Sequence, residues 1–185
     1  SRGGDLMSNP NIASRFDEIY NSTNRAVLAF ITAKCARTAD INDIYQDTYM
    51  ELYQVLRKRG VDYVTNEKAL VLRIAKRKVA RYYSLLERMR IFVSTNVVNE
   101  DGEEFELTDL EADAFLTEDF VVNQDLLESA KQLIQSKSEE IQKVFYLKYD
   151  VDLTISEIAQ ALSMSEQNVK NKLYRTLIEL RNLLG

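Results

Sequence analysis

Residues 154–175 read TISEIAQALSMSEQNVKNKLYR, and this stretch decides the fold of the C-terminal part of the chain. Thr154 and Glu157 have the spacing of a capping box, in which each side chain satisfies an open backbone donor of the other residue. The box predicts a short helix over 155–162. Three residues, 163–165, separate it from a longer helix over 166–184. A short helix, a three-residue turn and a longer helix form the helix-turn-helix arrangement.

The longer helix of this pair has an apolar side and a polar front. Val169 and Leu173 are four residues apart and face inward, and Ala159 is the small residue expected where the two helices cross. The polar residues at the start of the helix are of the types that reach base edges and phosphates in a major groove. The pattern favours DNA binding over an ordinary helical hairpin. The candidate contacts are Ser165, Glu166, Gln167, Asn168, Lys170, Asn171, Lys172 and Arg175.

The rest of the chain also has helical periodicity. Apolar residues at helical spacing predict helices over about 16–31, 40–59, 66–90 and 124–135, and one more that Ser138 can cap. Thr38 or Asp40 can cap the second helix, and Gly60 ends it. One Pro and five Gly are too few for a turn-rich β-sandwich. The expected fold class is all-α.

Charge divides the chain into segments. Residues 15–90 have a net charge of +6, residues 91–125 hold eleven acids and no base, and residues 126–185 are neutral overall. This division predicts two small helical domains, 15–92 and 124–185, joined by an acidic linker over 93–123. The linker is either a solvated tether or an acidic strand that lies in the basic channel of a partner. Residues 1–14 are expected to be a tag remnant and an N-terminal extension.

The composition excludes several classes of function. The chain has no His, so the commonest general base and metal ligand are missing, and Ser-His-Asp and zincin chemistry with them. The single Cys35 cannot form an internal disulfide, which favours the cytoplasm. It is expected to be a buried thiol, with a redox sensor as the alternative. No apolar run approaches the ~18 residues of a membrane span, so no membrane insertion is expected.

The third predicted helix has one basic side. A helical wheel places Ile74, Ala75, Val79 and Tyr82 on one arc, and Arg73, Lys76, Arg77 and Arg81 on the other. Lys78 falls among the apolar residues and must reach outward to solvent. The triplet Arg57, Lys58 and Arg59 ends the second helix. It either complements the helix dipole or contacts DNA.

The second predicted helix has a row of acids. Asp40, Asp43, Asp47 and Glu51 recur on one face at i, i+3, i+7 and i+11. Such a row can hold Mg²⁺ in an all-α nucleotide hydrolase, but that chemistry needs a second acidic helix, which this part of the chain lacks. It can also face a basic partner helix. We therefore expect no enzymatic activity, no cofactor and no metal.

Three stretches together carry a family resemblance. Residues 40–53 (DINDIYQDTYMELY) resemble the conserved region two of bacterial RNA polymerase sigma factors of the extracytoplasmic-function type. Residues 72–82 (LRIAKRKVARY) are similar to the family's helix that opens and reads the minus-ten promoter element. Residues 156–175 are similar to the region-four motif that reads the minus-thirty-five element.

The resemblance implies a sigma subunit that binds core RNA polymerase and directs promoter recognition and opening, with an anti-sigma factor as a further partner. It implies that polymerase is bound by Asp40, Asp43, Gln46, Asp47, Tyr49, Glu51 and Tyr53. It implies that the minus-ten element is bound by Arg57, Lys58, Arg59, Arg73, Lys76, Arg77, Arg81 and Tyr82. It implies that the minus-thirty-five element is bound by the polar front of the last helix. The alternative is a helix-turn-helix regulator that does not bind polymerase.

The chain departs from the family pattern at several positions. Arg77 stands in place of the usual Asn, and Lys172 in place of an Arg, so a bidentate contact there becomes a point charge. Ser163 replaces the Gly of the turn, where some backbone strain is expected. These departures leave the expected fold unchanged and affect the promoter sequence that is read.

Overall fold

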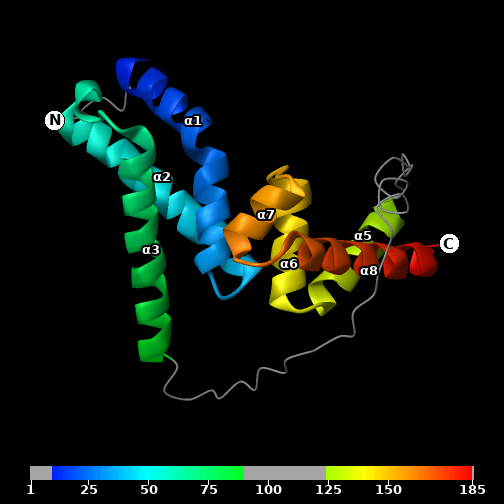
Figure 1. Ribbon diagram of the computed structural model, residues 1–185. Helices are drawn as coiled ribbons and strands as arrows, with labels where there is room; N and C mark the ends of the chain where they lie inside the picture. The colour runs from blue at the N-terminus through cyan, green and yellow to red at the C-terminus, as the bar shows by residue number, and fades with distance from the viewer. Residues whose placement is uncertain (1–9, 90–123, 185) are drawn as a thin grey trace. The chain divides into compact units, whose positions relative to one another are not determined.

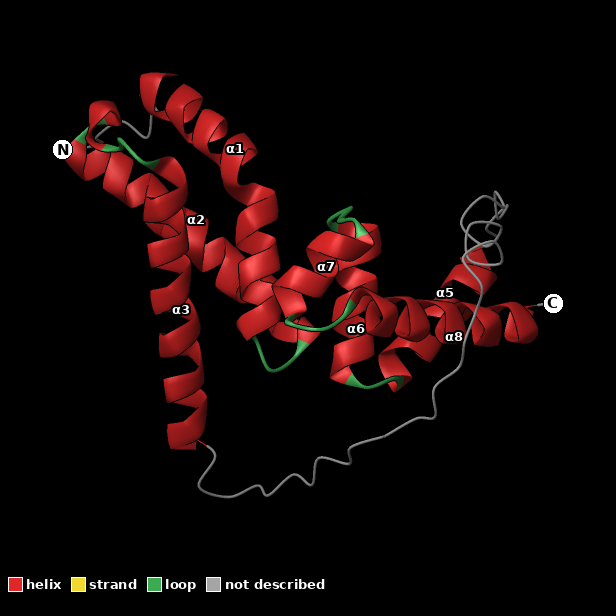
Figure 2. Ribbon diagram, in the orientation of Figure 1, coloured by secondary structure: helices red, strands yellow, loops and turns green. Residues whose placement is uncertain are grey.

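The structure is a computed structural model that describes residues 10–89 and 124–184. The described residues are helices, turns and short connections, with no strand among them, so the predicted all-α class is confirmed (Figures 1 and 2). The chain divides into two compact units, Ser1–Val93 and Ser94–Gly185. The acidic linker predicted over 93–123 lies outside the described residues.

The first unit is a bundle of three helices, α1 (Pro10–Lys34), α2 (Ile41–Arg59) and α3 (Glu67–Met89). Each helix packs against the other two. The apolar stripes that the sequence predicts form the core, because their spacing keeps them on one side of each helix. Buried members include Ile19, Ile31, Ile44, Leu52 and Ile74. Cys35 directly follows α1 and is buried, as expected for a core thiol.

Two single-turn 3₁₀ helices connect the bundle, η1 (Thr38–Asp40) and η2 (Val61–Tyr63). Gly60 ends α2 with φ +91°, in the left-handed half of φ space that glycine tolerates, and its N–H donates to the Leu56 carbonyl at 3.0 Å. At the start of α3, Asn66 caps the helix by accepting from the Ala69 N–H at 3.0 Å.

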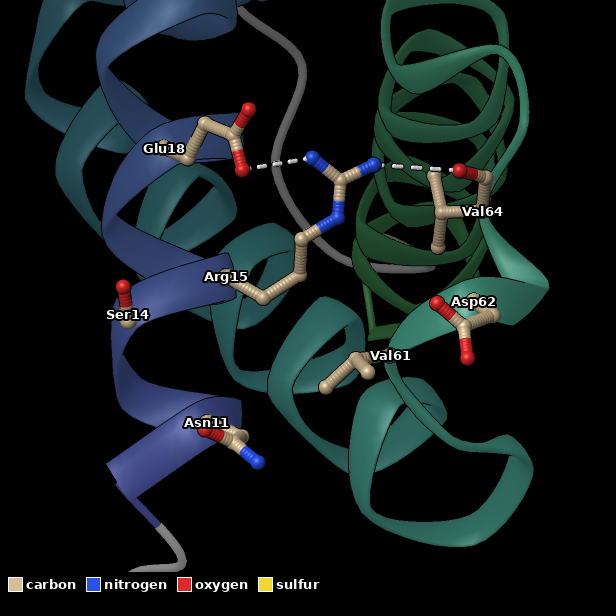
Figure 3. Close-up of a pocket in the computed structure, with 7 residues that line it drawn as sticks. All are labelled: Asn11, Ser14, Arg15, Glu18, Val61, Asp62 and Val64. Atoms are coloured by element: carbon tan, nitrogen blue, oxygen red, sulfur yellow. Dashed lines mark hydrogen bonds and ion pairs between the residues drawn. The ribbon is translucent and has the colours of Figure 1, made fainter.

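Arg15 connects α1 to the segment between η2 and α3 by hydrogen bonds. Its guanidinium donates to Glu18 and Glu67, both at 2.7 Å, and to the Val64 carbonyl at 3.1 Å. Figure 3 shows the bonds to Glu18 and Val64, with Asn11, Ser14, Val61 and Asp62 around the same hollow. Ser22 donates a further hydrogen bond to Glu67 at 2.7 Å. This network holds the chain where it reverses direction between α2 and α3.

The second unit contains α5 (Gln124–Ser136), α6 (Glu139–Phe145), α7 (Ile155–Leu162) and α8 (Glu166–Leu184). Ser138 caps α6, as predicted, by accepting from the Ile141 N–H. A π-helical segment, η3 (Tyr146–Asp150), follows α6, and the Val151 N–H closes its last turn on the Tyr146 carbonyl at 3.2 Å. The core is built from Val144, Leu147, Ile158 and Leu173.

The helix-turn-helix has the local geometry that its sequence predicts. Thr154 and Glu157 form the reciprocal capping box, with bonds of 2.8 and 3.2 Å. Ser163 ends α7 in the left-handed conformation, with φ 55° and ψ 46°. The Ser165 hydroxyl caps α8 by accepting from the Asn168 N–H at 3.1 Å. Across the described helices, none is long and apolar enough to cross a membrane.

Candidate nucleic-acid interface

The buried residues of α8 determine which of its side chains point outward. Val169 and Leu173 are buried, as predicted, together with Thr176 and Leu180, so their stripe faces the core of the second unit. At the start of the helix, Glu166, Gln167 and Asn168 are exposed. Four further candidates are half-buried, namely Lys170, Asn171, Lys172 and Arg175. The polar front therefore lies along the first three turns of α8.

Several members of this front are bonded within the unit. Gln167 donates from Nε2 to Asn171 Oδ1 at 3.0 Å, one turn further along α8. The Lys172 ammonium lies 2.7 Å from the Glu140 carboxylate of α6, and its side chain is 21% exposed. Lys172 is one of the DNA contacts that the sequence predicts. In the structure it joins α6 to α8, so part of its role is to hold the front in place.

In the first unit, α3 has the predicted basic side. Arg73, Lys76, Arg77 and Arg81 are all exposed. Arg77 is ion-paired with Glu51 of α2, and the Lys78 ammonium lies 3.0 Å from the same carboxylate. Lys78 therefore reaches outward along the apolar side, as predicted, and ends on an acid of the neighbouring helix.

The basic triplet at the end of α2 is exposed at all three positions, Arg57, Lys58 and Arg59. The Arg59 guanidinium lies over the ring of Tyr63, 5.5 Å from its centroid. This cation–π contact connects the end of α2 to the η2 turn. It leaves both functions considered for the triplet, dipole complementation and DNA contact, compatible with the geometry.

The row of four acids on α2 is split in the structure. Asp43 and Asp47 are exposed, and so is Gln46 between them. Asp40 is 3% exposed and Glu51 faces Arg77 and Lys78. The expectation of one outward row is therefore wrong for Asp40 and Glu51, because the packing of α3 against α2 covers that edge of the helix.

Asp40 lies in a buried polar cluster between the start of α2 and α3. Its carboxylate accepts from Tyr82 at 3.0 Å, from Tyr83 at 3.1 Å and from Arg37 at 2.9 and 3.3 Å. Tyr83 also accepts from the Ala36 N–H at 2.6 Å. The Asp40 side chain makes no capping bond at α2, contrary to one of the two caps considered for that helix. Tyr82, a predicted DNA contact, is tied by its hydroxyl to this cluster.

The cluster shifts the pKa of its members. Burial alone would raise the pKa of the Asp40 carboxyl, but hydrogen bonds from Arg37, Tyr82 and Tyr83 outweigh it and hold that pKa below its usual value. Burial raises the pKa of Tyr83 well above that of a free phenol. Asp40 is therefore ionised and Tyr83 neutral at pH 7. This arrangement does not fit the Mg²⁺ alternative, and no group of three candidate ligands occurs among the described residues.

An aromatic groove between α1 and α2 was not anticipated. It has a volume of about 470 Å³ and is lined by Phe16, Tyr20, Tyr45, Gln46, Tyr49, Met50, Tyr53 and Gln54. Two tyrosines of the groove, Tyr49 and Tyr53, are both expected to contact polymerase, but they differ in exposure. Tyr49 is buried, shares a hydrogen bond of 2.8 Å with Thr23, and burial raises its pKa to about 12.

Tyr53 is partly exposed on the wall of the groove, edge-on to Phe16. Met50 is 65% exposed beside it. The sequence held a signal for Met50, since it follows Gln46 and Asp47 at helical spacing and so lies on the same outer face of α2. A single apolar residue among polar ones does not by itself predict a binding surface.

Comparison with known proteins identifies the second unit. Residues 131–180 match the family model described as Sigma-70, region 4. The matched segment contains α6, η3, α7 and α8 as far as Leu180, and so includes the helix-turn-helix except for the last turn of α8. No curated protein matches the chain. The match assigns a DNA-binding role in transcription to this unit, and supports a sigma factor of the sigma-70 family.

Proposed function

We propose that the chain is an initiation sigma factor of the extracytoplasmic-function type, with region two in the first unit and region four in the second. In this assignment α8 binds the minus-thirty-five element and α3 the minus-ten element. The outer face of α2 binds core RNA polymerase. The observation that carries the proposal is the region-four match in the same chain as a bundle with an acidic face on α2 and a basic face on α3.

The surfaces of the first unit support these roles by their charge. The exposed cations of α3 are Arg73, Lys76, Arg77 and Arg81, a row that suits the phosphates of a separating duplex. On α2, exposed Asp43 and Asp47 precede the exposed Met50 on the same outer face. An acidic face with an apolar residue at one end suits a helical partner that presents cations beside an apolar seam.

The first experiment measures assembly. The full chain is mixed with core RNA polymerase, and co-purification is followed by run-off transcription from the region upstream of its own gene. The variant Asp43→Lys/Asp47→Lys is expected to lose core binding by at least about tenfold, since like charges then face the basic partner. Asp17→Lys, on an exposed position of α1, is the matched control and should bind like the unmodified chain.

Each outcome decides between the candidate functions. Core binding that disappears only in the α2 variant, with a run-off transcript from the unmodified chain, supports the sigma assignment. Sequence-specific DNA binding without any core binding identifies a helix-turn-helix regulator instead. Equal core affinity in the double variant refutes the α2 docking face.

A further inference from the structure

One carboxylate joins the acidic helix α2 to the basic helix α3. The two helices pack against each other (Figure 1), and Glu51 of α2 pairs through Oε1 with Arg77 and through Oε2 with Lys78 of α3. The two cations differ in exposure, since the Arg77 side chain is 59% exposed and that of Lys78 is 20% exposed. Arg77 can therefore turn to solvent or to a phosphate, whereas Lys78 would lose its partner at a half-buried position. Of the two ion pairs, the pair with Arg77 is the one that can open.

The same carboxylate lines a hollow that begins on the outer face of α2. The hollow has a volume of about 460 Å³ and is lined by Asp47, Met50, Glu51, Gln54, Val55, Lys58, Arg59 and Lys78. Along α2 its two ends differ in charge. Asp47 and Glu51 lie one turn apart, and the cations Lys58 and Arg59 follow about two turns further along. A partner that brings a cation to the acidic face of α2 can therefore place it at the end between Asp47 and Glu51.

Arg77 belongs at the same time to the basic face of α3, which also presents Arg73, Lys76 and Arg81. A phosphate that binds the Arg77 guanidinium draws it away from Glu51. A partner cation that approaches Glu51 repels Arg77, because both are positive and compete for the same carboxylate. Each event opens the same ion pair, so the second event meets a pair that is already open. The two ligands therefore favour each other.

We propose that the Glu51–Arg77 ion pair couples the two faces of the first unit. Core RNA polymerase bound at the hollow raises the affinity of α3 for DNA, and DNA raises the affinity of α2 for polymerase by the same factor. The inference rests on the proposed function and adds a regulation to it. An exposed ion pair corresponds to a coupling of about two- to fivefold. The pair is a feature of this chain, because the Asn that is usual in place of Arg77 in the family that the sequence resembles carries no charge.

The test measures the coupling as a ratio of affinities. Binding of the full chain to core RNA polymerase is titrated with and without a duplex from the region upstream of its own gene, and the ratio of the two dissociation constants is the coupling factor. Direct contacts between polymerase and DNA contribute equally in all variants, so differences between variants isolate the ion pair. We expect the factor to fall about two- to fivefold in Glu51→Gln and in Arg77→Gln. The double variant should show no larger fall, because both substitutions remove the same pair.

Arg73→Gln is the matched control. Arg73 is an exposed cation one turn before Arg77 on α3, and it forms no ion pair within the described part of the chain. Its variant should weaken DNA binding and leave the coupling factor unchanged. Arg77→Gln also guards against a structural explanation, because it opens the pair at an exposed position and leaves the contact between Glu51 and Lys78 in place.

The outcomes separate this inference from the proposed function. A coupling factor that is equal in the unmodified chain and in both variants, with core and DNA binding intact, refutes the coupling alone. A fall in Glu51→Gln that Arg77→Gln does not share means that Glu51 only holds α3 in place, and this result also refutes the coupling. An unmodified chain that binds DNA but not core polymerase refutes the proposed function, and the inference with it.

Discussion

Replacing Asp40 by Ala tests whether the buried cluster holds α3 against the start of α2. The carboxylate is 3% exposed and accepts from both Tyr82 and Tyr83. A hydrogen bond to a charged group contributes ~1.5–3 kcal/mol. The Arg37 side chain is 56% exposed, so solvent screens its ion pair, which adds at most ~1 kcal/mol. The substitution also removes the desolvation cost of the carboxylate, and the net loss of stability is expected to be about 2–4 kcal/mol.

Cys35 provides the assay, since it is the only cysteine and is 2% exposed within the first unit. Its reaction with a thiol reagent under native conditions measures the free energy of opening of that unit separately from the second. A loss of about 2 kcal/mol raises the labelling rate roughly 30-fold. Asp17→Ala, an exposed acid of α1, is the control. If Asp40→Ala labels at the rate of the unmodified chain, the cluster does not stabilise the unit.

Three further predictions follow from single contacts. The depressed pKa of Asp40 means that its ionisation stabilises the first unit above the ordinary carboxyl pKa of about 4. This stability is lost as the pH falls below that value. Asp40→Asn has no carboxyl to protonate at this position, so acid should accelerate the thiol labelling of this variant less than that of the unmodified chain. Ser163→Gly should stabilise the second unit by about 0.5–1 kcal/mol, because Ser163 has φ 55° and glycine adopts a positive φ without steric cost. Slower hydrogen exchange in α7 and α8 would confirm this prediction, and faster exchange would contradict it. Glu51→Gln frees Arg77 from its ion pair and should raise DNA affinity about two- to fivefold at low salt, with a steeper salt slope; unchanged affinity and slope would contradict the pairing.

The sequence predicts the helices of this protein well because their signals are local. Apolar spacing finds the buried stripes, and short-range signals such as Gly60 and the Thr154–Glu157 box find the helix ends. The strain expected at Ser163 is also local, because it depends on one residue and the turn that it occupies. The longer extent of α1, which begins at Pro10, agrees with the preference of proline for the first turn.

The candidate sites are predicted less completely, because a helical wheel shows the face of one helix and not the neighbour that covers its edge. On that wheel Asp40 and Glu51 share a face with Asp43 and Asp47. Asp40 and Glu51 lie at the margin of that face, where they are bonded to the tyrosines and cations of α3. The bond between Lys172 and Glu140 was missed for the same reason, since it joins two helices whose packing no periodicity specifies.

The two margin acids also connect surfaces that the sequence treats as separate. Asp40 and Glu51 are eleven residues apart, about three turns of α2, and each is bonded to α3, at Tyr82 and Tyr83 in one case and at Arg77 and Lys78 in the other. The acidic face of α2 and the basic face of α3 therefore share one edge. A substitution at either margin acid alters both faces at once, and loss of polymerase binding in such a variant would not locate the docking surface. Asp43 and Asp47 form no hydrogen bond or ion pair with the described part of α3, although the charge of Asp43 acts on Tyr82. Charge reversal at these two positions therefore tests the α2 face with less effect on α3 than a change at Asp40 or Glu51.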